Sequence, residues 1–150
     1  MIIGVGNAFR GDDAVGLIVA QHIREHAPNL AVYESSGEGA ALMSLWQQAE
    51  TVLLIDAVSS KSEPGTIHCL DASNQPLPTS WRCFSTHAFG VAEAIELART
   101  LGQLPRQLTV YGIEGGQFAL QPGLSPAVEQ AVPLVVQRIL HDVTSQGTAA

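Results

Sequence analysis

The chain has 150 residues, of which 46% are hydrophobic and only 14% are Asp, Glu, Lys or Arg, against about 25% charged residues in an average soluble domain. Seven basic residues against 14 acidic ones give a formal net charge of −7, so the chain lacks the cationic surface that nucleic acid or an anionic membrane would require. The length and the apolar content exclude a charge-rich disordered segment and predict one globular domain over residues 1–150.

Cysteine usage and the N-terminal segment indicate the compartment. Cys69 and Cys83 are too few for a disulfide framework, and neither belongs to a CxxC pair. The apolar residues 1–5 are interrupted at Gly6 without a basic leader, unlike a signal peptide. No stretch approaches the roughly 20 apolar residues of a membrane span. We therefore expect a soluble, cytoplasmic protein with reduced thiols.

Strand and helix patterns alternate along the chain. Short apolar or alternating runs predict strands at residues 1–5, 31–35, 51–58, 65–70 and 108–113. Apolar residues at helical spacing predict helices at residues 15–26, 41–46 and 91–101, and a further one in the last segment. The segment 71–82, with two prolines and several Ser, Thr and Asn residues, reads as a long loop.

Three helix ends need separate interpretation. Ser85 or Thr86 can cap the helix over residues 91–101. Ser125-Pro126 has the chemistry of a helix start, but Pro133 lies inside the same pattern, so the last helix either kinks there or begins there. Residues 144–150 are expected to be a frayed tail.

The alternation predicts the fold class α/β, as a three-layer α/β/α sandwich with a mainly parallel twisted sheet and helices on both faces. Ligands of open α/β sheets lie outside the carboxyl ends of the strands. The loops expected at that edge comprise residues 6–13, 36–39, 56–60 and 114–116.

A dinucleotide site at Gly4-Val5-Gly6 is the first possibility, because these residues follow a strand and lead into a helix. The fingerprint requires a third glycine where the chain has Phe9. Asp12 and Asp13 also stand where a pyrophosphate would meet the helix N-terminus, and they would repel it. This interpretation is therefore disfavoured.

Acidic residues at the same edge fit a cation better. Asp12 is placed to cap the following helix, and Asp13 in the first turn is favourable to the helix dipole. Asp56 closes the most apolar strand, where a buried charge requires a cation, several backbone donors or a proton. Loop amides alone could satisfy Asp56.

His87 stands beside Ser85 and Thr86 at a helix entrance, unlike the other four histidines, which lie on helices or within a strand. A lone histidine there is often an ordinary polar loop residue. Combined with Asp13 and Asp56, however, it gives two carboxylates and one imidazole, a set that suits nickel, zinc, iron or manganese. There is no GxSxG nucleophile elbow, and no pattern supports Cys83 as a nucleophile.

Motifs spread over nearly the whole chain resemble the hydrogenase maturation proteases in order and spacing. They are Gly4-Val5-Gly6-Asn7, Arg10-Gly11-Asp12-Asp13 with Gly16, Leu54-Ile55-Asp56-Ala57, Thr86-His87, Tyr111-Gly112-Ile113-Glu114 and Leu124-Ser125-Pro126. Each motif is short, but the combination is specific.

The resemblance implies an endopeptidase that removes the C-terminal extension of a nickel–iron hydrogenase large-subunit precursor after nickel insertion. It implies that Asp13, Asp56 and His87 are both the metal-contacting and the catalytic residues, although the first ligand is often Glu in the family. Substrate contacts are implied at Asn7, Gly37 and Gly39.

Nickel would arrive with the precursor, so no resident cofactor is expected. The partner would be the nickel-loaded precursor, with no nucleic acid and no membrane, and the protein is expected to be a monomer. Two alternatives stay open: a non-hydrolytic binding module that checks for nickel, and a metallohydrolase that keeps a resident metal.

Overall fold

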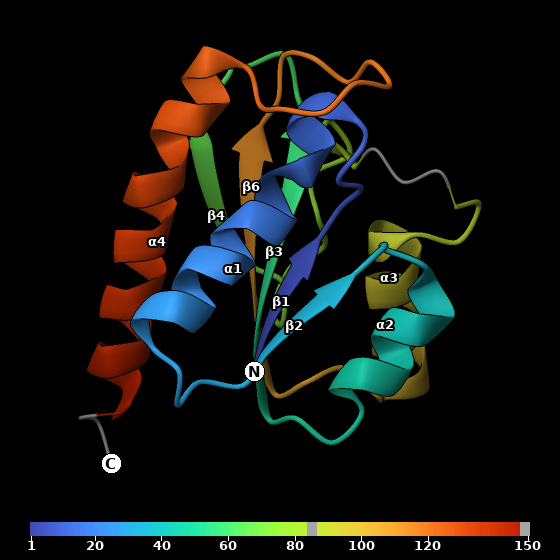
Figure 1. The fold of residues 1–150 in the computed structure, drawn as a ribbon. Coiled ribbons are helices and arrows are strands. Elements are labelled where there is room, and N and C mark those ends of the chain that lie inside the picture. Colours follow the sequence, from blue (N-terminus) through green and yellow to red (C-terminus); the bar gives the residue numbers. More distant parts are fainter. Residues whose placement is uncertain (84–86, 148–150) are drawn as a thin grey trace.

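The computed structural model describes residues 1–83 and 87–147, which form one mixed sheet with helices around it (Figure 1). The strands are β1 (Ile2–Val5), β2 (Val32–Ser35), β3 (Thr51–Ser59), β4 (Ile67–Asp71), β5 (Arg82–Cys83) and β6 (Gln107–Glu114). The helices are the 3-10 helix η1 (Gly11–Ala14) and the α-helices α1 (Val15–His26), α2 (Gly39–Trp46), α3 (Val91–Leu101) and α4 (Pro126–Gly147).

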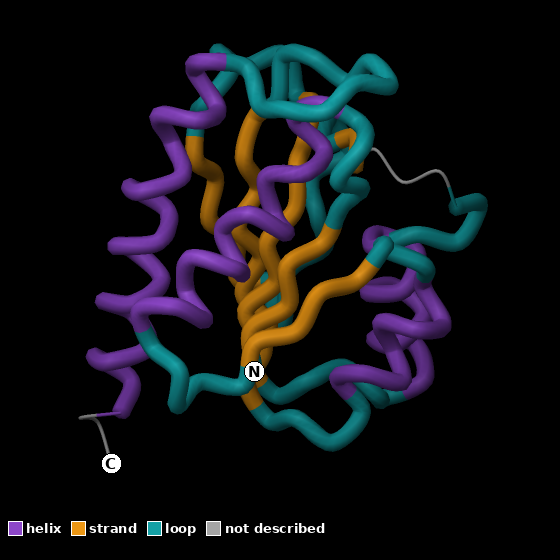
Figure 2. Tube along the Cα trace, viewed as in Figure 1, coloured by secondary structure: helices purple, strands orange, loops and turns teal. Residues whose placement is uncertain are grey.

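The sheet has the strand order β2-β1-β3-β6-β4, and the short β5 pairs with β3 outside this path. The pairs β1–β2, β1–β3 and β3–β6 are parallel, whereas β4 is antiparallel to β6 and β5 is antiparallel to β3. Helices lie on both sides of the strands (Figure 2). The predicted three-layer sandwich with a mainly parallel sheet is therefore confirmed.

Each face of the sheet has its own hydrophobic core, because successive side chains of a strand point to opposite faces. The core under α1 and α4 includes the buried residues Val19, Ile23, Ile55, Ile113 and Val135. The core under α2 and α3 includes the buried residues Leu42, Leu54, Ala94, Ile95 and Val110. Both faces of β1, β3 and β6 are thus covered, which explains why these strands read as continuous apolar runs.

The starts of α2 and α3 depend on glutamate side chains. Glu38 caps α2, because its carboxylate accepts hydrogen bonds from the amides of Ala40 and Ala41 at 3.0 and 2.8 Å. At α3 the N-cap is Gly90, whose amide donates to Glu93 at 3.1 Å. The predicted caps are Ser85 and Thr86, which lie outside the described residues. The N-cap in the structure is Gly90 instead.

The structure decides where the last helix begins. α4 begins at Pro126, as the Ser-Pro pair indicates, and it continues through Pro133 to Gly147. Of the two alternatives at Pro133, a helix that begins there is wrong. Residues 144–147 of the predicted frayed tail belong to α4, and residues 148–150 lie outside the described residues. Packing of Val135 and Ile139 against the sheet explains why the helix continues beyond the proline.

The central strand is also longer than predicted. β3 extends to Ser59, so Asp56 lies within the strand rather than closing it. Backbone pairing to β6 continues as far as Val58 and Glu114, which keeps these residues extended beyond the aspartate. In the described part of the chain, no helix is long and apolar enough to cross a membrane.

Gly16 permits the close approach of α1 to the sheet. A Cβ atom at this position would collide with the backbone oxygens of Val5 and Ile55. We expect Gly16→Ala to lower the free energy of unfolding by about 2 kcal/mol or more, because backbone atoms cannot rotate away. Urea denaturation measures this. Gly147→Ala, where the added Cβ would meet nothing within 4 Å, is the control and should have little effect.

Candidate active site

Four carboxylic acids are buried in the described part of the chain, and all of them lie near the carboxyl edge of the parallel strands. They are Asp12, Asp13, Asp56 and Glu114, with exposed fractions between 0 and 4%. Burial of a charged carboxylate is unfavourable unless donors or cations surround it. The partners of each acid therefore indicate what it does.

Asp12 binds the loop between β6 and α4. Its carboxylate accepts hydrogen bonds from the amides of Gly116, Gln117 and Ser125 at 2.8, 2.9 and 2.7 Å. The Ser125 hydroxyl donates a fourth hydrogen bond at 2.8 Å. The local sequence predicts that Asp12 caps the following helix, but neither η1 nor α1 has a side-chain cap. That assignment is wrong: the carboxylate joins two loops.

Asp13 is buried beside Asp12 but has fewer favourable partners. Burial raises the pKa of its carboxyl group to about 6, while the charge of Arg10 and a backbone hydrogen bond from Asn7 act in the opposite direction. The Asn7 side chain accepts a hydrogen bond from the Phe9 amide at 2.9 Å, which shapes the loop ahead of η1. Asp13 is thus ionised at neutral pH and is a stronger base than an exposed aspartate.

Asp56 lies where β3 changes its partner strand. On one side of β3, the register with β1 ends at Gly4 and Ile55, and antiparallel pairing with β5 begins at Val58. On the other side Asp56 stays paired with Gly112 of β6. η1, which carries Asp13, contacts β3. The alternation of the strand puts Asp56 on the same face as Leu54, toward α2 and α3.

His87 lies in a bend ahead of the N-cap Gly90, on the side of the sheet covered by α2 and α3. It lies close enough to Glu38 for the two charges to interact. The pKa of the Glu38 carboxyl is lowered mainly by the amides of Ala41 and Ala40, and also by the charge of His87. His87 therefore lies near the start of α2, on the face to which the alternation assigns Asp56.

The loop over residues 36–39 lies between the segments that carry Asp13 and His87. Gly6 donates its amide hydrogen bond to Ser35 at 3.0 Å, and the Gly39 amide donates to Phe89 at 2.8 Å. Gly37 has a φ of +88°, which a side chain would disfavour. A Cβ at Gly39 would collide with the Phe89 ring. Packing against Phe89 thus explains why position 39 is a glycine. The substrate contacts at Gly37, Gly39 and Asn7 stay predictions.

Glu114 is the fourth buried acid, and the sequence alone predicts no role for it. Its carboxylate accepts hydrogen bonds from the amide and hydroxyl of Ser60 at 2.7 and 2.8 Å, and it lies 3.3 Å from Nε2 of His68. In the sequence Glu114 comes directly after an apolar run, as Asp56 does, so the same reasoning could have identified it as a buried charge. It holds the β3–β4 connection against the end of β6.

The predicted metal trio stays a prediction. Among residues 1–83 and 87–147, no group of three or more His, Cys, Asp or Glu side chains is arranged to hold a metal ion. Asp13 and Asp56 belong to elements in contact, η1 and β3. His87 is placed with Glu38 on the neighbouring side of the same edge.

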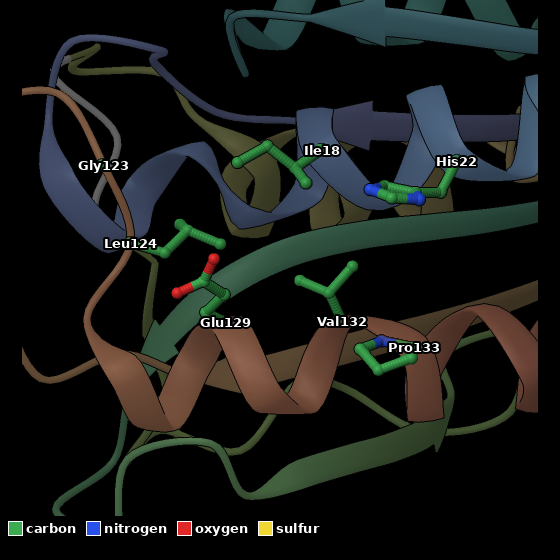
Figure 3. Close-up of a pocket in the computed structure, with 7 residues that line it drawn as sticks. All are labelled: Ile18, His22, Gly123, Leu124, Glu129, Val132 and Pro133. Carbon is green, nitrogen blue, oxygen red and sulfur yellow. The ribbon is translucent and has the colours of Figure 1, made fainter.

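A cavity of about 600 Å³ lies between α1 and α4 (Figure 3). Its lining consists of Ile18, His22, Gly123, Leu124, Glu129, Val132 and Pro133. None of the predicted site residues lines it. Its lining holds one imidazole and one carboxylate and is otherwise apolar. The cavity therefore does not offer a set of metal ligands.

A matching family model and two curated relatives of this chain carry closely similar descriptions. The family model described as hydrogenase maturation protease matches residues 18–142, a range that contains Asp56 and His87 but not Asp13. The hydrogenase 2 maturation protease of Escherichia coli K12 is 25% identical over 154 residues, covering 100% of this chain and 93% of that protein. A putative hydrogenase maturation protease of Methanocaldococcus jannaschii is 29% identical, covering 95% of each chain.

Solved structures agree in fold. The hydrogenase maturating endopeptidase HybD from Escherichia coli superposes with a TM-score of 0.77 at 22% identity, covering 97% of this chain and 92% of that chain. The maturation protease HybD from Thermococcus kodakarensis gives a TM-score of 0.69 at 23% identity, covering 95% and 96%.

The Asp12 hydrogen bonds give a stability prediction. We expect Asp12→Asn to lower the free energy of unfolding by about 3 kcal/mol or more, because an amide cannot accept from all four donors and leaves buried N–H groups unpaired. Urea denaturation measures the change. In the control Asp71→Asn, an exposed carboxylate that accepts from Ser73 and Asn74 is replaced, and a loss of about 1 kcal/mol or less is expected.

Asp13 gives a pH prediction. Its pKa is raised from 3.8 to about 6 in the folded protein, so the folded state holds this proton more tightly and loses stability as the pH rises through that range. Asp13→Asn should therefore unfold at higher urea concentration than wild type at about pH 7.5, with a difference that disappears toward about pH 4.

The control variant, Asp71→Asn, should change the stability in the opposite direction. Hydrogen bonds, chiefly from Ser73 and Asn74, lower the pKa of Asp71, so its ionised form stabilises the fold above the unfolded pKa. Asp71→Asn should therefore be less stable than wild type at neutral pH. Equal stability of Asp13→Asn and wild type across the whole pH range would contradict the unfavourable burial of the Asp13 charge.

Proposed function

Because the chain belongs to the hydrogenase maturation protease family, we propose that it removes the C-terminal extension of a nickel–iron hydrogenase large-subunit precursor, after nickel has been inserted. It is a peptidase, as its relatives and structural neighbours are. In this proposal nickel is part of the substrate and not a resident cofactor. Asp13, Asp56 and His87 contact that nickel and test for its presence.

The observation that carries the proposal is the pair of buried aspartates at the carboxyl edge. Asp13 and Asp56 are both 4% exposed, and they belong to η1 and β3, which contact each other. The switch point of an α/β sheet is the general location of its ligand site. Burial raises the pKa of Asp13 to about 6, a feature found at functional sites more often than at structural ones.

The chemistry follows from these groups. Two carboxylates and an imidazole suit a borderline divalent ion such as nickel, which would complete its coordination with groups of the precursor. Before nickel is present the pKa of the Asp13 carboxyl is about 6, so this group is mostly ionised near neutral pH and can bind the cation. Water attacks the scissile carbonyl carbon, and a carboxylate of the aspartate pair accepts the proton of the water. That carboxylate returns the proton to the amide nitrogen as the C–N bond breaks, so that the nitrogen leaves as the amine.

The test is a cleavage assay on purified precursor. We expect wild-type protein to shorten nickel-loaded precursor, seen as a mass loss at its C-terminus, and to leave nickel-free precursor intact. Asp56→Asn and His87→Ala should each lower the rate with nickel-loaded precursor by about a hundredfold or more, because each removes a group that acts in the reaction. Circular dichroism checks that the variants are folded.

Glu25→Gln, which removes an exposed carboxylate near the far end of α1, is the matched control and should cleave at the wild-type rate. Cleavage at the normal rate by Asp56→Asn would refute the assigned site. Binding of the precursor without cleavage would favour a non-hydrolytic nickel checkpoint. Stoichiometric zinc or manganese in the purified protein would favour a hydrolase with its own metal.

A further inference from the structure

Two large hydrophobic side chains are exposed on the loops next to the candidate active site. In the described part of the chain, Phe9 and Leu120 are the most exposed large hydrophobic residues, at 74% and 85%. Single exposed apolar residues are common on protein surfaces and require no explanation. The relation between these two residues is what carries the inference.

The two residues belong to loops that lie side by side, although they are far apart in the sequence (Figure 1). The Gly11 amide donates to the backbone oxygen of Gln121 at 2.8 Å, and the Asp12 amide donates to that of Gln117 at the same distance. Phe9 and Leu120 are thus each within two residues of this backbone contact, and together they are named the Phe9–Leu120 surface.

The backbone beneath this surface is held in place. The Asp12 carboxylate binds both ends of the loop that carries Leu120, through Gly116 and Ser125. The Arg10 guanidinium donates to the Phe118 backbone oxygen at 3.4 Å. A partner that binds here finds loops that are already ordered, which reduces the entropy lost on association.

The surface is continuous with the candidate site. Phe9 lies in the loop between Asn7 and η1, and the backbone of Asn7 forms a hydrogen bond with the Asp13 carboxylate. A protease that cuts one extension from a folded protein must hold that protein as well as the scissile bond. Aromatic and aliphatic side chains form the apolar centre of many protein–protein interfaces, and Phe9 and Leu120 expose such side chains beside the site.

We propose that the Phe9–Leu120 surface docks apolar side chains of the hydrogenase large-subunit precursor at the rim of the active site. The inference rests on the proposed function, because it takes that precursor as the partner. A second copy of this chain is a less suitable occupant, since its body would lie over the edge where Asp13 must meet substrate.

The test uses the double variant Phe9→Ser/Leu120→Ser and nickel-loaded precursor. We expect KM to rise about tenfold while kcat stays within about twofold of wild type, because contacts remote from the reacting bond contribute to binding and not to chemistry. Thermal unfolding should be unchanged, since both side chains are exposed. Leu97→Ser/Leu101→Ser on α3, at 40% and 55% exposure, is the matched control and should keep the wild-type KM.

An unchanged KM, or a fall in kcat alone, would overturn the docking proposal while leaving the proposed function intact. If wild type does not cut the precursor, the proposed function fails, and calorimetric titration of the precursor still tests docking: weaker binding by the Phe9 and Leu120 variant supports it and equal binding overturns it. Sedimentation that shows a wild-type dimer, lost in the variant, would assign the surface to self-association and overturn the proposal.

Discussion

The carboxylate of Asp12 joins the first loop of the chain to the last one, and the carboxyl edge of the sheet depends on it. Its four donors lie 104 to 113 residues away in sequence. A buried carboxylate with that many hydrogen bonds has replaced its hydration shell by protein donors, so it stabilises only one arrangement of the two loops. Loss of the charge would weaken the contact between these two segments, which the backbone amides of Gly11 and Asp12 also hold together.

Glu114 acts in the same way on the next loop, because it holds Ser60 of the β3–β4 connection and lies beside His68. Asp12 and Glu114 are therefore acids whose burial is balanced by several donors from the protein. For Asp13 the balance is different: burial outweighs the effects of Arg10 and Asn7, and the pKa rises. The donors and the positive charge around Asp13 do not offset the unfavourable burial of its negative charge. Such a carboxylate can bind a cation or a proton from outside the chain.

The sequence was informative where local pattern determines structure. Val15–His26 was predicted with its observed bounds, since apolar periodicity and a following Pro28 define that helix. The role of Asp12 could not be predicted in this way, because a capping aspartate and one that binds a distant loop have the same local sequence. Asp56 was expected at a strand end for a related reason: the pairing of Val58 and Glu114, which prolongs β3, is a contact between distant segments.

The antiparallel strands explain why the candidate site lies at Asp56. Only residues 60–66 connect β3 to β4, too few for the crossover helix that a parallel neighbour requires, so the chain turns back at the carboxyl edge. β5 likewise runs against β3 and pairs with Val58 and Ser59, beyond the point where β1 has ended. Asp56 and Ala57 lie between the stretch of β3 that pairs with β1 and the stretch that pairs with β5. Among the described residues, these two pair with neither strand. The glycine at position 16 lets α1 approach the backbone at this point. A change of partner strand and a close helix approach thus place an aspartate where β3 pairs with β6 between its pairing with β1 and with β5, and short-range sequence patterns do not encode this.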